Sequence, residues 1–185
     1  MKLVRPGERH LASYVDALER GYAPDNVRGR AEADEQREAI RRDSAAFLAG
    51  LDDRKAAGAP IALPDGSTVP RLPGFHRWMW DGTFCGSIAL RWQPRTEALP
   101  PHCLGHIGYS VVPWKQRRGH ATRALALMLV RARVTGLRYV DITTDPDNLA
   151  SRRTIEANGG VLHEMFVKPA AFGNGPGCRY RIRLG

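Results

Sequence analysis

The stretch that decides the fold is residues 105–124, which read GHIGYSVVPWKQRRGHATRA. Its first half predicts a β-strand, because Ile107, Tyr109 and Val111 alternate with smaller or more polar residues. Pro113 has no N–H group to give to a neighbouring strand, so the strand should end before it. We therefore expect a central strand that leads directly into a basic segment.

A basic loop and the start of a helix follow this strand. Residues 115–118 read KQRR, and Gly119 opens an amphipathic helix whose apolar residues recur at helical spacing. The first N–H groups of a helix have no intrahelical acceptors, and the helix dipole adds partial positive charge there. Gly119 and Ala121 leave room for a ligand to approach the backbone. With Arg117 and Arg118 beside it, this corner is a predicted anion cradle.

The loop lacks the motifs of two common nucleotide sites. No Gly-Lys-Ser/Thr follows, and there is no Gly-x-Gly-x-x-Gly. Residues 116–121, QRRGHA, instead resemble the Gln/Arg-x-x-Gly-x-Gly/Ala signature of the GNAT superfamily of acetyl-CoA-dependent N-acetyltransferases. A second block, residues 143–160, resembles the Asn-x-x-Ala/Ser…Gly segment of that family. Both blocks are specific for the superfamily and say almost nothing about the substrate.

The rest of the chain supplies elements in an order that is also the GNAT order. Periodicity and turn signals predict strands over residues 1–5, 75–80, 83–92, 105–112, 138–144, 161–168 and 178–184, and helices over residues 7–20, 31–51, from Gly119 to a cap at Gly136, and from a cap at Asn148 to Gly159. Turns are expected around Asn26 and at Asp65, the latter within a proline-rich loop or small hairpin over residues 58–74. The resemblance implies an α/β (α+β) GNAT fold. Its central mixed, mostly antiparallel, twisted sheet would have about seven strands, flanked by about four helices and splayed between the two central strands.

Length and composition set further limits. With 185 residues, 43% of them hydrophobic, the chain is long enough for one core, so we expect a single domain over residues 1–185. Neither a signal peptide nor a membrane-spanning run is recognisable in the sequence, which predicts a cytoplasmic protein without a membrane partner. Whether it is a monomer or a homodimer is left open.

Cysteines and charge exclude other classes. The three cysteines, Cys85, Cys103 and Cys178, are odd in number and scattered, which argues against a disulfide framework and against a metal site. The formal charge of +9 raises the possibility of nucleic-acid binding. Its arginines are spread along the chain without a recognisable nucleic-acid motif, and a phosphorylated cofactor accounts for part of the charge. We therefore expect no nucleic-acid partner.

The resemblance implies that acetyl-CoA is the cofactor and indicates which residues hold it. Main-chain N–H groups around the helix start would wrap the pyrophosphate, those of Arg117, Arg118, Gly119, His120, Ala121 and Thr122, with the Thr122 hydroxyl as a further donor. The central strand would pair with the pantetheine arm over residues 109–112, with Val111 and Val112 as cofactor-binding residues, and the N–H of Val111 would face the developing oxyanion. Asn148 and Ser151 are expected beside the same arm.

The general base is predicted to be His106. An imidazole has an ordinary pKa of about 6.5, which suits proton transfer near neutral pH. His106 also lies on the central strand, where several relatives carry a glutamate that acts as the base. The alternative is a histidine whose ring is bonded to a neighbouring strand. His102 is a weaker substitute as the base, and His120 belongs to the cofactor loop.

One position departs from the family pattern. Many relatives place a tyrosine seven residues after the asparagine of the second block, where it protonates the leaving thiolate, but here that position is Ile155. Tyr109, Ser151 and Cys103 are candidate donors instead, and we assign Tyr109 to the catalytic site.

These residues predict an N-acetyltransferase that moves an acetyl group from acetyl-CoA to a primary amine by direct attack in a ternary complex. A small-molecule acceptor is preferred over a protein, because residues 58–74 and 94–104 could close over a compact ligand. The alternatives are a non-catalytic acyl-CoA-binding module, a protein N-acetyltransferase and a basic nucleic-acid-binding protein.

Overall fold

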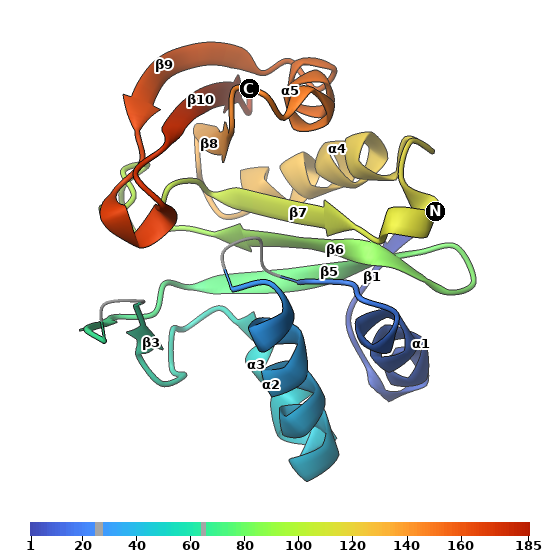
Figure 1. Ribbon diagram of the computed structural model, residues 1–185. Helices are drawn as coiled ribbons and strands as arrows, with labels where there is room; N and C mark the ends of the chain where they lie inside the picture. The colour runs from blue at the N-terminus through green and yellow to red at the C-terminus, as the bar shows by residue number, and fades with distance from the viewer. Residues whose placement is uncertain (25–27, 64–65) are drawn as a thin grey trace.

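The computed structural model of the protein describes residues 1–24, 28–63 and 66–185 (Figure 1). The turns expected at Asn26 and Asp65 lie outside these ranges. Within them, no helix combines the length and the apolar character that crossing a membrane requires.

The elements follow the predicted order closely. The strands are β1 (Lys2–Val4), β2 (Asp52–Asp53), β3 (Ile61–Ala62), β4 (Thr68–Val69), β5 (Gly74–Trp80), β6 (Phe84–Arg91), β7 (Ile107–Val111), β8 (Tyr139–Thr144), β9 (Val161–Val167) and β10 (Pro176–Arg183). The helices are α1 (Glu8–Glu19), α2 (Arg30–Arg42), α3 (Ser44–Gly50), α4 (His120–Arg133) and α5 (Leu149–Glu156). Two short 3-10 turns, η1 (Pro113–Lys115) and η2 (Ala170–Phe172), complete the set. Seven of these strands are three or more residues long, which is the number expected, and β2, β3 and β4 are two-residue additions.

The strands form two larger sheets and a small hairpin. One sheet has the order β1-β5-β6-β7, with β2 added beside β5, and the other has the order β8-β10-β9. The hairpin is β3-β4, within the segment for which a loop or hairpin was expected. Helices α1, α2 and α3 lie on one side of the first sheet, and α4 lies on the other (Figure 1). This α/β arrangement confirms the predicted fold class.

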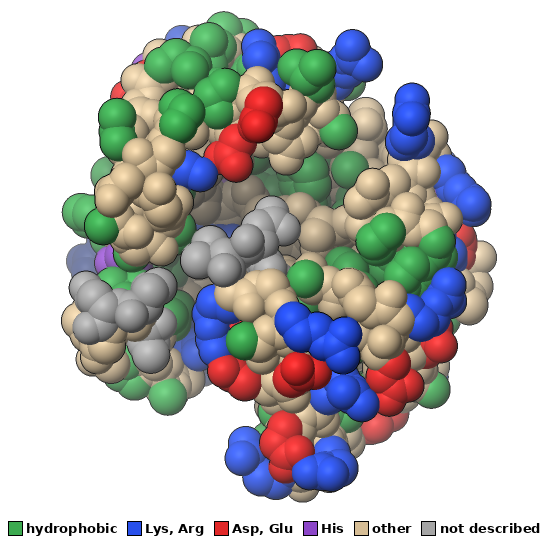
Figure 2. Space-filling model, viewed as in Figure 1, with side chains coloured by type: hydrophobic (Ala, Val, Ile, Leu, Met, Phe, Trp, Pro, Cys, Tyr) green, Lys and Arg blue, Asp and Glu red, His purple; other side chains and the backbone are tan. Residues whose placement is uncertain are grey.

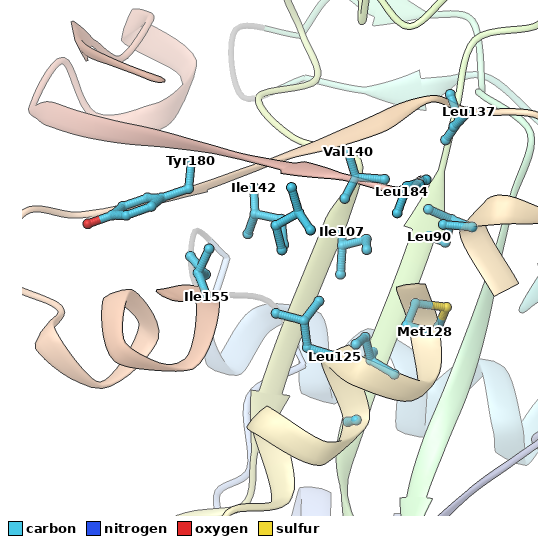
Figure 3. Packing of buried hydrophobic residues seen from close by; sticks show 14 of the residues in the cluster. Leu90, Ile107, Leu125, Met128, Leu137, Val140, Ile142, Ile155, Tyr180 and Leu184 are labelled. Carbon is cyan, nitrogen blue, oxygen red and sulfur yellow. The ribbon is translucent and has the colours of Figure 1, made fainter. Parts of the chain in front are cut away.

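Each face of the first sheet buries its own hydrophobic cluster, because neighbouring residues of a strand point to opposite faces. On β5, Trp78 packs with aromatic residues of the α1 side, including Tyr14, whose ring stacks on it at 4.5 Å between centroids. The next residue, Met79, belongs to the cluster on the other side, which contains Leu125 and Met128 of α4. Figure 3 shows these α4 side chains directed at residues of β7 and β8. The clusters fix α4, and with it the loop before it, against the strands.

The prediction of one long helix over residues 31–51 is wrong in one respect, because the chain forms two helices there. Asp43 separates α2 from α3 with an extended backbone (φ −160°, ψ 92°). Its carboxylate accepts a hydrogen bond from the N–H of Ala46 at 2.9 Å, which caps the start of α3. An aspartate followed by serine is a helix-start signal, and it was present in the sequence.

The two larger sheets meet at β7 and β8 but do not merge. No ladder joins these strands in the part of the chain that the structure describes. They are held together at one end, where the N–H of His106 donates to the carbonyl of Asp141 at 2.7 Å. Both strands run away from this point and separate, which is the splay predicted between the central strands.

Candidate active site

A cavity of about 1050 Å³ occupies the space between the separating strands. Its walls come from β7 and the loop after it, the first turn of α4, the end of β8, the start of α5 and the β9–β10 region. The space-filling view is hollowed above β7, next to the β9–β10 region (Figure 2). Residues far apart in the sequence therefore share one surface.

Strand β7 turns toward this cavity an edge with which no other strand of the described residues pairs, although the Val111 carbonyl there accepts from the Gln116 side chain at 3.2 Å. Its other edge is bonded to β6, as the N–H of Val112 to the carbonyl of Cys85 (3.0 Å) and the N–H of Arg91 to the carbonyl of His106 (2.9 Å) show. In an antiparallel pair, alternate residues direct both main-chain groups to the partner strand. By this register, the N–H groups of Tyr109 and Val111 point away from β6 and toward the cavity.

Val112 does not fit its predicted role as a cofactor-binding residue. Its N–H already donates a hydrogen bond to the carbonyl of Cys85 on β6, and its own carbonyl accepts from the N–H of Lys115 at 3.0 Å. The side chain is fully buried in the cluster on the α1 side. The strand's alternation places Val111 at the cavity and turns Val112 away from it.

The start of α4 forms the second wall. Gly119 has a left-handed backbone (φ 73°) and offers no side-chain cap to the helix, so the first N–H groups are left to a ligand or to solvent. Arg117 is also left-handed (φ 60°), which bends the loop sharply before the helix. Most of the predicted cradle lines the cavity, namely Arg117, Gly119, His120, Ala121 and Thr122. Arg118 is exposed and does not line it.

The start of α5 supplies polar groups opposite β7. The Asn148 side-chain oxygen accepts from the N–H of Ser151 at 3.0 Å, so Asn148 caps the helix as the sequence suggested. This cap uses only the oxygen of the amide, and both residues line the cavity. The Ser151 hydroxyl lies 2.9 Å from the Tyr109 hydroxyl, which links α5 to β7 across the opening. Burial raises the pKa of Tyr109 to about 12, so its hydroxyl keeps its proton at neutral pH.

His106 has a different setting from the one that a general base needs. It has no exposed surface and does not line the cavity. Its Nδ1 accepts a hydrogen bond from the N–H of Asp141 at 2.9 Å. Burial lowers its pKa, an effect that the neighbouring Asp141 opposes. The alternative reading, a histidine bonded to a neighbouring strand, describes this geometry.

A network of hydroxyl groups lies on the α1 side of β7 and was not predicted from the sequence. The hydroxyl of Tyr22 lies 3.0 Å from that of Ser87 on β6 and 2.5 Å from that of Ser110 on β7. Tyr22 and Ser110 line the same cavity as the α4 cradle, so the cavity reaches both sides of β7. Tyr22 follows α1 in a turn, and no local signal in the sequence connects it to β7.

The sequence also did not predict a polar cluster that holds the loop before α4 in place. The Lys115 ammonium donates to a carboxylate oxygen of Asp81 (2.7 Å) and to the Thr83 hydroxyl (2.5 Å), and it lies 3.5 Å from the Cys85 sulfur. Possible metal-binding atoms of Asp81, Cys85 and His120 lie within 4.8 Å of one another. A metal ion here would have to displace the ammonium, so we assign none. The cluster ties the loop before α4 to the β5–β6 turn.

The position of the usual family tyrosine is closed to the cavity. Ile155 is 0% exposed and packs in the core cluster with Ile142 and Tyr180 (Figure 3). It can neither reach a ligand nor transfer a proton.

A family model described as an acetyltransferase (GNAT) domain matches residues 33–161, well over half of the chain. The chain belongs to the GNAT acetyltransferase family. No curated protein sequence matches it.

Several solved GNAT acetyltransferases have a similar fold. The microcin C7 self-immunity acetyltransferase MccE, in complex with acetyl-CoA and AMP, is 12% identical with a TM-score of 0.64, over 98% of this chain and 91% of that one. The protein acetyltransferase RimL in complex with coenzyme A is 15% identical with a TM-score of 0.61, over 98% and 92%. A variant of the spermidine N-acetyltransferase SpeG from Vibrio cholerae is 13% identical with a TM-score of 0.60, over 100% and 95%. At these identities the likeness shows the fold, while the acceptors of these proteins range from a polyamine to a protein.

Proposed function

We propose that this GNAT chain is an acetyl-CoA-dependent N-acetyltransferase that acts on a primary amine of a small molecule in a ternary complex. The observation that carries the proposal is one cavity that joins the start of α4, which has no side-chain cap, the edge of β7 that pairs with no described strand, and the opposite side of β7. One ligand can enter beside α4 and a second beside Tyr22 and Ser110, so that both meet at β7.

The donor half of the cavity fits coenzyme A chemically. Uncapped N–H groups at a helix start suit a diphosphate, and the left-handed Gly119 keeps side-chain atoms away from them. A peptide-like arm suits the free edge of β7 around Tyr109 and Val111, because such an edge offers main-chain donors and acceptors in strand spacing. The side-chain nitrogen of Asn148, which its cap does not use, can donate to the same arm.

Two groups on β7 would assist the chemistry. Acetyl-CoA supplies an acetyl group activated as a thioester, and the reaction forms a C–N bond to the amine as the C–S bond breaks. The N–H of Val111 would stabilise negative charge that develops on the thioester oxygen, a contribution of about 3 kcal/mol when the donor is aimed in advance. The neutral Tyr109 hydroxyl would donate a hydrogen bond to the departing sulfur. The amine nitrogen loses one proton, and the sulfur finally gains one.

The small-molecule preference is supported by the second half of the cavity. Tyr22 and Ser110 line it from one side, and Phe166 and Phe172 from the other. A volume of about 1050 Å³ has to hold both the pantetheine end and the acceptor, which favours a compact acceptor. One observation favours a second candidate, an acyl-CoA-binding module without turnover. The buried Ile155 removes the usual proton donor of the family.

Calorimetry with acetyl-CoA and a thiol-release assay over a panel of amines test the proposal. Ala121→Glu places a carboxylate at the predicted anion cradle and should abolish acetyl-CoA binding, because like charges repel in a site of this kind. The matched control is Ala126→Glu, on the exposed face of the same helix, which should bind normally. Absence of binding in the unaltered protein would refute the proposal. Tight binding with no turnover on any amine would favour the non-catalytic module.

A further inference from the structure

His106 forms an unusual link at the point where β7 and β8 meet. Its main-chain N–H donates to the carbonyl of Asp141 at 2.7 Å, and the N–H of Asp141 donates back to the ring Nδ1 of His106 at 2.9 Å. In a regular pair of strands, both acceptors would be main-chain carbonyls. Here one acceptor is a side-chain nitrogen.

The main-chain carbonyl of His106 cannot accept the Asp141 N–H, because it already has a partner. It accepts the N–H of Arg91 on β6 at 2.9 Å, so the residue is already bound to the strand on its other side. The ring therefore allows one residue to contact β6 and β8 at the same time. Ile107 and Ile142, the residues that follow His106 and Asp141 in the chain, both line the cavity.

Two neighbouring features hold the partners of this link in position. A methyl group on Gly105 would lie 3.1 Å from the carbonyl oxygen of Asp141 and 3.2 Å from the N–H nitrogen of Thr143, so the glycine is what allows the backbones to approach. The Asp141 carboxylate forms two hydrogen bonds with Arg181 of β10, at 2.8 and 2.9 Å. Asp141 is thus fixed to β10 through its side chain and to His106 through its backbone.

The same hydrogen bonds leave His106 no means of accepting a proton from a substrate. Because Nδ1 accepts from Asp141, a neutral ring carries its proton on Nε2. The one lone pair that could act as a base is then occupied by the Asp141 N–H. Nε2 is buried with no hydrogen-bond partner among the described residues, and the residue does not line the cavity.

We propose that His106 is a positioning residue whose ring Nδ1 replaces a strand carbonyl, ties β8 to β7 and so sets the width of the cleft. The inference rests on the proposed function, since the width decides how the Val111 N–H and the groups of α5 face a thioester. Burial lowers the pKa of the ring; of the charged groups that act on it, Asp141 raises that pKa and Arg91 lowers it.

The experiment compares His106→Asn with His106→Gln. The side-chain oxygen of asparagine lies as many bonds from the backbone as Nδ1 does, so it can accept the Asp141 N–H. Glutamine carries its oxygen one bond further out, and both variants lose the ring. We expect His106→Asn to keep kcat within about threefold, and His106→Gln to lose about tenfold or more, because small displacements of reacting groups are costly. Amide exchange at Asp141 should stay slow only in the unaltered protein and in His106→Asn.

The outcomes separate this inference from the proposed function. Equal, large losses of kcat in both variants, with acetyl-CoA affinity and slow Asp141 exchange retained, would overturn it in favour of a direct proton-transfer role. Fast Asp141 exchange in the unaltered protein would also overturn it. If the unaltered protein bound no acetyl-CoA, the proposed function would fail, while the exchange measurement would still decide whether the ring ties the strands.

Discussion

Replacing Tyr109 by phenylalanine tests the chemical step most directly. The change removes one oxygen and keeps the ring, so the wall of the cavity retains its shape. The lost contacts are the 2.9 Å hydrogen bond with the Ser151 hydroxyl and a longer one to the Ser151 main-chain carbonyl (3.3 Å), worth about 1 kcal/mol of the free energy of unfolding. A hydrogen bond to a charged acceptor, such as a departing thiolate, is worth about 1.5–3 kcal/mol. We therefore expect kcat to fall about 10- to 100-fold, with little change in the affinity for acetyl-CoA.

The pH dependence of this loss follows from the pKa of Tyr109. Burial raises that pKa to about 12, so the hydroxyl is protonated, and able to donate, at every lower pH. The ratio of kcat between the unaltered protein and Tyr109→Phe should thus stay constant from about pH 7 to pH 10. Thiol release at saturating acetyl-CoA and amine measures it.

A second variant, Ser151→Ala, distinguishes a role of Tyr109 in the reaction from a role in holding the structure together. Ser151→Ala removes the hydroxyl–hydroxyl hydrogen bond but leaves the Tyr109 hydroxyl and its contact with the Ser151 main-chain carbonyl in place, so its unfolding free energy should fall by no more than in Tyr109→Phe and its kcat by less. Equal falls of kcat in the two variants, or a loss below about twofold in Tyr109→Phe, would refute the role of Tyr109 as the donor.

Two further predictions concern stability. Asp43→Ala removes the cap of α3 and should lower the free energy of unfolding by about 1 kcal/mol in urea denaturation; an unchanged midpoint would contradict the capping role. The hydrogen bond from Lys115 holds the pKa of Asp81 well below its usual range, so its contribution to stability is present above the unfolded-state pKa of about 3.9 and is lost as the pH falls below it. The difference in melting temperature between the unaltered protein and Asp81→Asn should therefore shrink as the pH falls from about 5 to about 2, and a constant difference would count against the pairing.

Much of the fold could be predicted because its signals are local. Alternation marked β5, β6 and β7, and the helix start at Gly119 combined a glycine with helical spacing of apolar residues. The break between α2 and α3 was missed, although Asp43 carried a capping signal, because the residues on both sides suit a continuous helix: charged side chains and alanines before it, and alanines with Phe47 and Leu48 after it. Where an element ends depends on a single side chain, and a periodic pattern does not resolve that.

Only part of the candidate site could be predicted from the sequence. The residues of the cradle, apart from Arg118, and those of the α5 start line the cavity, since within each segment they follow one another along the chain. The surroundings of His106 could not be predicted, because its partner Asp141 is 35 residues away and contributes a main-chain N–H, which every residue but proline has. The Tyr22 network likewise joins positions 65 and 88 residues apart.

The unpaired edge of β7 has a consequence for how such a site changes over time. Its donors and acceptors are peptide groups, so a substitution at Tyr109 or Val111 alters the neighbourhood of the groove but leaves the groove's own hydrogen-bonding atoms in place. Under the proposed function, substitutions around Tyr22 and Phe166 can therefore reshape the acceptor end of the cavity, while the main-chain groups that face the thioester arm persist whatever side chain Val111 carries.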